Sequence, residues 1–155
     1  MTTDVMMAHA RFLELAIDQA RQGRAEGGIP IGSVLVRGGE VIGRGRNRRV
    51  QNSSPILHGE MDCLDRAGRR TAAEYRQSVL YTTLSPCAMC TGAILLFRIP
   101  TVVIGENRTF MGCEDLLRSA GVEVVVLQDE ACIALMTDFI RERPELWRED
   151  IAEVS

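Results

Sequence analysis

The chain has 155 residues, of which 46% are hydrophobic and 25% charged, and its formal net charge is −3. This length suits one domain, residues 1–155, that buries about 68–70% of its unfolded surface without disulfides or a structural metal. All 18 basic residues are arginine, which excludes a lysine Schiff base and a Walker-type phosphate loop because both need the lysine amine. The negative charge gives no general attraction to nucleic acid, so "RGRNRR" (44–49) is the only cationic segment to consider.

The amino-terminal segment does not resemble an export signal. Asp4, Arg11, Glu14 and Asp18 interrupt its apolar stretch, whereas a signal peptide has an uninterrupted apolar region. No apolar run reaches the roughly 18 residues of a membrane span. We therefore expect a cytoplasmic protein without a membrane partner, whose five cysteines are thiols or metal ligands.

The first half of the chain predicts a helix, a hairpin and a second helix. Apolar residues recur near helical spacing over 4–21, and "AEGG" then stops the helix. Two β-branched runs within 29–47 flank Gly38–Gly39, a turn-forming pair, and predict a β-hairpin. The polar segment 48–55 predicts a loop, and 58–68 predicts a short second helix.

The second half alternates strands with helices. Buried-type strands are predicted at 78–84, 99–106 and 122–128, and helices at 85–98, 113–121 and 129–143, the last stopped by Pro144. This alternation favours an α/β fold, a three-layer α/β/α sandwich with a central mixed five-stranded sheet. The nearly continuous apolar strands favour positions covered on both faces.

Two cysteines three residues apart, Cys87 and Cys90, stand where the helix predicted at 85–98 begins. Ser85 predicts the N-cap and Pro86 the first helical position, which places both cysteines in the opening turns on one face. Free backbone N–H groups and the helix dipole favour thiolates there. Three interpretations are open: a thioredoxin-like redox pair, a closed structural zinc site, and a catalytic zinc site with a position for water.

The two histidines of the chain separate these interpretations. His9 lies in the first predicted helix and has no predicted chemical role. His58 opens the second, with Glu60 two residues on, and H-x-E followed by P-C-x-x-C is the pattern of zinc-dependent nucleobase and nucleoside deaminases. We therefore predict one Zn²⁺ held by His58, Cys87 and Cys90. Glu60 is the predicted catalytic residue, which shuttles protons between water and substrate.

Beyond this motif, seven segments spread over nearly the whole chain carry a family resemblance. They are "GGIPIGSVLV", "VIGRGRN", "LHGEMDCLDRAGR", "LYTTLSPCAMCTGAI", "VVIGEN", "VEVVVL" and "FIRERPELWREDI". The chain resembles the fungal-type cytosine deaminases, and the tail is the more specific match. The resemblance implies a cytidine-deaminase-like fold, a homodimer and a free nucleobase substrate, with cytosine converted to uracil and ammonia.

The resemblance also implies contacts to the substrate. Asn47 matches an asparagine that contacts the pyrimidine, and Gly59 matches a backbone contact to the base. Ser85 matches a backbone contact to the oxygen on the zinc. From its local pattern alone, Asn47 is equally a turn residue, and this alternative stays open.

Three further matches lie toward the end of the chain. Phe110 matches an aromatic residue that packs over the ring, and Trp147 and Asp150 match residues that close the pocket and hydrogen-bond the base. By pattern alone, Phe110 is a core residue, and the other two belong to a solvated helix end. The remaining cysteines, Cys63, Cys113 and Cys132, match no ligand position and are predicted to be buried thiols.

Two loops depart from the family pattern and leave the identity of the ring open. Arginines surround Asn47, and the segment 107–117 differs around Phe110. The alternatives are a tRNA adenosine deaminase that binds phosphates through these arginines, a deaminase of guanine, isocytosine or a creatinine-like ring, and a non-catalytic zinc protein that binds RNA. Gly59, where the tRNA enzymes usually have alanine, and the acidic segment after Ile140 favour a nucleobase over nucleic acid. Glu60 argues against a non-catalytic protein.

Overall fold

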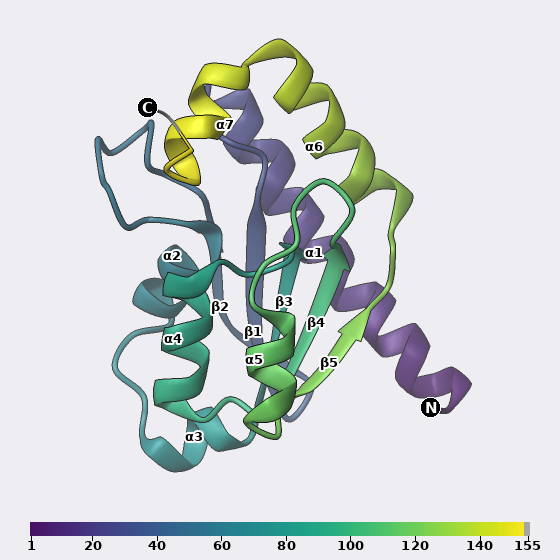
Figure 1. Ribbon diagram of the computed structural model, residues 1–155. Helices are drawn as coiled ribbons and strands as arrows, with labels where there is room; N and C mark the ends of the chain where they lie inside the picture. The colour runs from purple at the N-terminus through teal and green to yellow at the C-terminus, as the bar shows by residue number, and fades with distance from the viewer. Residues whose placement is uncertain (154–155) are drawn as a thin grey trace.

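The strands of the chain form one mixed sheet. A computed structural model describes residues 1–153, in which the strand order is β2-β1-β3-β4-β5 (Figure 1). The strands are β1 (Gly32–Arg37), β2 (Glu40–Arg46), β3 (Ser78–Leu84), β4 (Thr101–Glu106) and β5 (Glu123–Val126). Strand β1 pairs antiparallel with β2 and β3, whereas β3–β4 and β4–β5 are parallel. The predicted mixed five-stranded sheet is therefore confirmed.

Helices cover both faces of this sheet. Those described within residues 1–153 are α1 (Thr3–Ala25), α2 (Gly59–Ala67), α3 (Ala72–Arg76), α4 (Ala88–Phe97), α5 (Glu114–Ser119), α6 (Glu130–Glu142) and α7 (Pro144–Asp150). Helices α1 and α6 lie on one face and α2, α4 and α5 on the other, while α7 packs at one end of the sheet (Figure 1). The three-layer α/β/α architecture is confirmed.

The strands alternate their side chains between two apolar cores, because successive residues of a strand point to opposite faces. Val34 and Tyr81 pack with Phe12 of α1, whereas their neighbours Leu35 and Leu80 belong to the core beneath α2 and α4. Each such leucine, fully buried, contributes about 1.5–3 kcal/mol to folding. This double coverage fixes the sheet as a platform for the loops at its ends.

The structure corrects the predicted helices in three places. Helix α1 extends beyond the predicted range 4–21 to Ala25, the residue at which the predicted stop "AEGG" begins. Helix α3 was missed, although Thr71 and Glu74 form a complete capping box at its start. Helix α7 was also missed, because Pro144 both ends α6 and occupies the first position of α7. At that position the backbone N–H makes no hydrogen bond within the helix, so proline is tolerated.

None of the helices within residues 1–153 combines the length and the apolar character needed to cross a membrane.

Candidate active site

His58, Cys87 and Cys90 lie together where helices α2 and α4 begin. The Nδ1 atom of His58 is 3.4 Å from the Sγ of Cys87 and 3.8 Å from the Sγ of Cys90. A tetrahedral zinc ion with bonds of about 2.0–2.1 Å to nitrogen and 2.3 Å to sulfur separates such donors by roughly 3.6 Å. The three side chains therefore fit one zinc ion. Within residues 1–153 the cluster contains these three donors, one fewer than a closed structural site requires.

The charges within this donor set favour a thiolate. The contact with Cys90 and the His58 ring lower the pKa of Cys87 to about 4, although burial opposes them. The same contact with Cys87, together with burial, raises the pKa of Cys90 well above that of a free thiol. Burial alone would lower the pKa of His58, but the hydrogen bond with Cys87 and the carboxylates of Asp150 and Glu60 raise it to about 9. The site thus attracts positive charge.

Helix α2, which carries His58 and Glu60, lies directly on β2. A Cβ atom at Gly45 would stand 2.2 Å from the backbone nitrogen of Cys63, so only glycine permits this approach. Asp62, on the same helix, accepts the backbone N–H of Arg46 at 3.0 Å. These contacts fix the end of β2, and therefore the Asn47 that follows it, against the start of α2.

The predicted N-cap of the cysteine helix is wrong. Helix α4 begins at Ala88, Cys87 is its N-cap, and Cys90 lies in its first turn. Ser85 cannot cap this helix because its hydroxyl donates to Glu114 at 2.6 Å and accepts the N–H of Gly112 at 2.9 Å. The C-x-x-C spacing nevertheless brings both sulfurs to the Nδ1 of His58, as predicted for a shared metal.

Asp150 connects the carboxyl-terminal helix to the donor cluster. Its side chain is 2% exposed, and its Oδ1 accepts the amide of Asn47 at 2.9 Å and the guanidinium of Arg49 at 3.4 Å. Its Oδ2 lies 3.4 Å from the Nε2 of His58. The carboxylate thus stands on the far side of the His58 ring from the sulfurs, where it can orient the ring.

Phe110 and Trp147 form an aromatic pair beside this carboxylate. Their ring centroids are 5.8 Å apart and the rings are nearly perpendicular, the edge-to-face arrangement that aromatic pairs favour. Trp147 belongs to an apolar cluster with Ile31, and Phe110 packs partly buried against it. Counting backbone and side chain together, Trp147 and Asp150 are each 7% exposed. The interpretation of this segment as a solvated helix end is therefore wrong.

These elements enclose a narrow cavity. It has room for about 20 Å³, which corresponds to about one water molecule. Its lining includes seven of the predicted site residues, namely His58, Glu60, Ser85, Cys87, Phe110, Trp147 and Asp150. Cys90 lies beside it in the donor cluster, Asn47 reaches it through Asp150, and Gly59 packs on Ile31. Burial raises the pKa of Glu60, although the positive charge of His58 opposes this shift.

The arginines around Asn47 are paired within the chain. Arg46 contacts both carboxylate oxygens of Glu26, at 2.8 and 2.9 Å, and this hydrogen bonding lowers the pKa of Glu26 to about 2. Arg48 donates to Asp62 at 3.0 Å, and Arg49 contacts Asp150. Their positive charge is therefore largely balanced locally.

Three buried acidic residues, Asp62, Glu106 and Glu114, were not predicted, and Arg49 was considered only as a phosphate contact. Glu106 is fully buried at the end of β4 and accepts the N–H groups of Arg108 and Thr109 at 2.7 and 2.9 Å. A single acidic residue at the end of an apolar strand is a usable sequence signal, because a buried carboxylate needs partners.

Comparison with known proteins agrees with this geometry. Residues 6–106 match the family profile described as the cytidine and deoxycytidylate deaminase zinc-binding region. The chain is 54% identical over 142 residues to a cytosine deaminase of Candida albicans, covering 91% of this chain and 95% of that protein. It is 38% identical over 107 residues to a tRNA-specific adenosine deaminase of Streptococcus pyogenes, covering 68% of this chain and 67% of that protein.

A solved structure from a study of A-to-I editing by tRNA:A34 deaminases superposes with a TM-score of 0.70 and 27% identity, covering 81% of this chain and 99% of that one. With the His58–Cys87–Cys90 cluster in place, the chain belongs to the zinc-binding cytidine and deoxycytidylate deaminase family.

Proposed function

We propose that this chain catalyses the zinc-dependent hydrolysis of free cytosine to uracil and ammonia. The observation that carries the proposal is the preassembled His58–Cys87–Cys90 cluster with buried Glu60 on the same cavity. The cytosine deaminase of Candida albicans supports the choice of base, because the similarity extends through the tail that closes the cavity. The three ligands would hold Zn²⁺, which when bound supplies the Lewis acidity that makes water a nucleophile near neutral pH.

Glu60 moves the protons in this proposal. It lies two residues after His58 at the start of α2 and is 4% exposed, so bulk water does not compete for its carboxylate. The water oxygen bonds to the ring carbon that carries the amino group, and Glu60 takes the released proton and passes it to the ring nitrogen. The second proton, from the hydroxyl group now on that carbon, then passes through Glu60 to the amino group. The carbon–nitrogen bond breaks, ammonia leaves, and the carbon–oxygen bond becomes the new carbonyl of uracil.

The other predicted site residues would bind and orient the base. One N–H of the Asn47 amide is held by Asp150, which leaves its second N–H to donate to the pyrimidine. The Asp150 carboxylate would accept hydrogen bonds from the base, the backbones of Gly59 and Ser85 would provide further polar contacts, and the aromatic pair Phe110–Trp147 would exclude water. The polar contacts would fix orientation and the aromatic contacts would supply most of the binding energy.

An ammonia-release assay over cytosine, cytidine, adenine, guanine, isocytosine, creatinine and a tRNA anticodon stem-loop tests this proposal. We expect turnover of cytosine well above that of the other compounds. Activity confined to the stem-loop would contradict the nucleobase proposal. Activity confined to guanine, isocytosine or creatinine would identify that compound, and not cytosine, as the substrate.

The tRNA alternative lacks a matching surface around the cavity. Of the four arginines that would have to hold phosphates, Arg44 is exposed, but Arg46 is paired with Glu26, and Arg48 and Arg49 are paired with the buried carboxylates of Asp62 and Asp150. Helix α7 lies beside the same loop, and Arg49 donates to the backbone oxygen of Glu149 at 3.0 Å. Binding RNA phosphates here would require breaking these pairs, which favours the small substrate.

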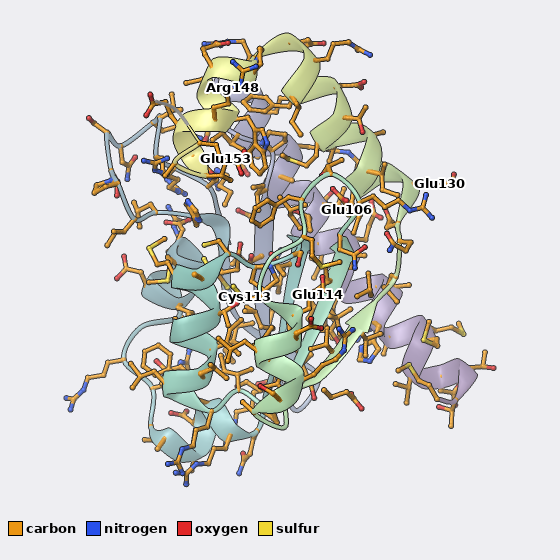
Figure 2. All side chains as sticks on the ribbon, in the orientation of Figure 1. Glu106, Cys113, Glu114, Glu130, Arg148 and Glu153 are labelled. Atoms are coloured by element: carbon orange, nitrogen blue, oxygen red, sulfur yellow. The ribbon has the colours of Figure 1, made fainter. Side chains whose placement is uncertain are left out.

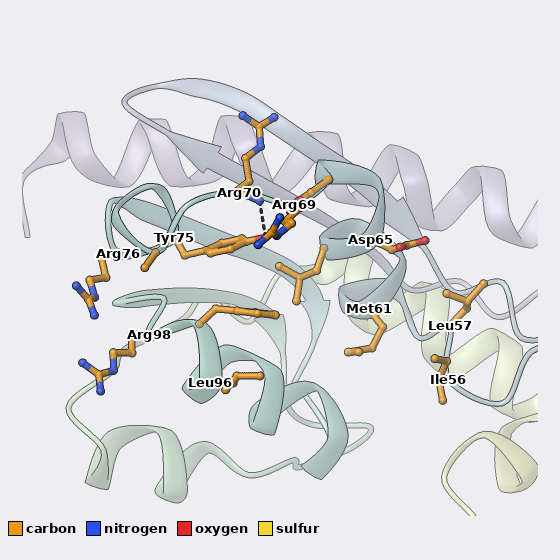
Figure 3. Close-up of a pocket in the computed structure, with 14 residues that line it drawn as sticks. Ile56, Leu57, Met61, Asp65, Arg69, Arg70, Tyr75, Arg76, Leu96 and Arg98 are labelled. Carbon is orange, nitrogen blue, oxygen red and sulfur yellow. Dashed lines mark hydrogen bonds between the residues drawn. The ribbon is translucent and has the colours of Figure 1, made fainter.

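We also propose that the chain forms a homodimer. A groove of about 830 Å³ runs between α2, α3 and α4, and its residues include Ile56, Met61 and Leu96. Leu96 is 75% exposed and Ile56 is 52% exposed. Large apolar side chains exposed together in this way are typical of a surface that a partner protein buries. Figure 3 shows Met61 and Leu96 in the groove, with Arg98 at one end. Ile56 and Leu57, which line the groove, immediately precede His58 in the chain, so a partner in the groove would contact the segment that leads to the active site.

Light scattering after size-exclusion chromatography tests the homodimer. We expect a dimer for the native chain and a monomer for Leu96→Glu. Leu116→Glu is the matched control, because Leu116 is 51% exposed on α5 and lies outside the groove. A monomeric native chain would contradict the proposal.

We also propose that the protein is cytoplasmic, a proposal supported by its unpaired cysteines, which suit a reducing compartment.

A further inference from the structure

Ser85 holds two segments of the site together through its hydroxyl group. The hydroxyl donates to Oε2 of Glu114 at 2.6 Å and accepts the backbone N–H of Gly112 at 2.9 Å. Ser85 is 3% exposed and Glu114 is 2% exposed, so water does not compete for either contact. A serine hydroxyl rotates freely unless a partner fixes it, and here the Glu114 carboxylate provides that partner.

The second oxygen of Glu114 is also occupied. Oε1 accepts the side-chain amide of Asn107 at 3.2 Å, and the Oδ1 of Asn107 accepts the amide of Gln128 at 2.6 Å. Glu114 therefore accepts one hydrogen bond on each oxygen, from Ser85 and from Asn107, and only a group that accepts on both oxygens satisfies these two donors together. The half-exposed Arg118 adds a contact of 3.6 Å, which contributes little at the surface.

This network ends on the loop that carries Phe110. Figure 2 places Glu106 at the end of β4 and Glu114 at the start of α5, on either side of that loop, residues 107–112. Gly112 packs so tightly that a Cβ there would stand 1.9 Å from the backbone oxygen of Pro86. The loop is thus pressed onto the segment immediately before Cys87, and Phe110 meets the edge of Trp147 above the cavity.

We propose that Glu114 is a positioning residue that fixes the Ser85 hydroxyl and thereby seats the 107–112 loop, with Phe110, over the substrate cavity. The inference rests on the proposed function in that the cavity binds the base. Glu114 touches neither the base nor the three metal donors in this arrangement; it acts through Ser85 and Gly112. The contact of Phe110 with the ring is made equally in the ground and transition states, so its loss raises KM and leaves kcat nearly unchanged.

The test compares Glu114→Gln with Asp115→Asn in the zinc-loaded enzyme. Gln keeps the shape of Glu114 but turns one acceptor into a donor that faces Asn107 or Ser85. Asp115 is the next residue of the same helix, is exposed, and loses the same charge. For Glu114→Gln we expect KM for cytosine to rise about tenfold, the change that follows from losing one hydrogen bond to a charged group. We expect kcat and zinc content to remain near native values, and Asp115→Asn to match the native enzyme.

Trp147 provides a readout that does not depend on turnover. It is the single tryptophan of the chain and contacts Phe110, so acrylamide should quench its fluorescence more strongly in Glu114→Gln than in the native protein. Unchanged KM and unchanged quenching in Glu114→Gln would overturn the proposal. If cytosine is not a substrate of the native enzyme, the proposed function fails while the quenching experiment still decides the role of Glu114.

A double-mutant cycle with Ser85→Ala shows whether Glu114 acts through Ser85. The alanine variant keeps the backbone of Ser85 and removes only the hydroxyl. We expect the effects of Ser85→Ala and Glu114→Gln on KM and quenching to be strongly non-additive. Fully additive effects would contradict the proposed path. If Glu114→Gln does not fold, Asn107→Ala and Ser85→Ala test the two ends of the network separately, and native behaviour of both would overturn it.

Discussion

Replacing Asp150 with asparagine should weaken zinc binding. The substitution keeps the shape of the side chain, and its one oxygen can still accept from Asn47 and Arg49, as Oδ1 does now at 2.9 and 3.4 Å. Its amide nitrogen would then face the Nε2 of His58, where Oδ2 now stands at 3.4 Å. Two donors would oppose each other in a site where the Asp150 side chain is 2% exposed. The orientation of the His58 ring toward the sulfurs would therefore lose its support.

The size of this effect follows from the position of Asp150 behind the histidine. Carboxylates that orient a zinc-bound histidine typically contribute 10–100-fold to metal affinity, or about 1.4–2.7 kcal/mol. Competition with a chromophoric chelator at fixed pH measures the zinc dissociation constant directly. The matched control is Glu149→Gln, an exposed neighbour on α7, for which we expect the native constant. A native zinc affinity in Asp150→Asn would refute the orienting role assigned to this carboxylate.

Three further predictions address the proton shuttle, the packing of α2 and a buried histidine. Glu60→Gln should retain stoichiometric zinc but lose about 10²–10⁴-fold in kcat, because the amide cannot carry the proton; a normal turnover number would contradict its role. Gly45→Ala should destabilise the protein by at least about 1–3 kcal/mol in urea unfolding, since its Cβ would meet the backbone of Cys63 at 2.2 Å, and native stability would show that α2 can move away. Burial lowers the pKa of His9 from 6.5, against a weaker opposing effect of Glu123, so the unfolded chain takes up the proton first and His9 stabilises the fold less as the pH falls below that value. Urea unfolding of the zinc-saturated protein at pH 7.5 and 5.5 should therefore show a larger loss for the native chain than for His9→Gln, and equal losses would contradict this account.

The sequence predicted those parts of the molecule that depend on local pattern. β-Branched and nearly continuous apolar runs predicted the strands, and the H-x-E and P-C-x-x-C motifs predicted that His58, Glu60, Cys87 and Cys90 share one site. The hairpin at Gly38–Gly39 followed from turn chemistry, and both glycines have positive φ, 57° and 81°. The strands and the turn depend on residues that are close together in the chain, whereas the two halves of the zinc motif are 29 residues apart and are joined by a known motif pattern.

The sequence failed where distant residues compete for one group. Ser85 has the local pattern of an N-cap, but its hydroxyl bonds to Glu114, 29 residues away. Asn47 and Asp150 are 103 residues apart, so no spacing rule connects them, and only the family resemblance suggested a shared role. Arginines in a polar loop suggested phosphate binding or solvation, whereas Arg46 and Arg48 are satisfied by carboxylates on other elements. Such pairings depend on the complete fold.

Helix α7 has only seven residues, fewer than the roughly 12–15 that even a favourable isolated helix needs in water. Its order therefore depends on the burial of Trp147 and on the bonds of Asp150 to Asn47 and Arg49. A ligand in the cavity would contact the same two α7 side chains. Its binding free energy would therefore add to the stability of α7 against local unfolding. Slowed amide hydrogen exchange along α7 thus becomes a direct measure of occupancy, even for compounds that the enzyme does not convert.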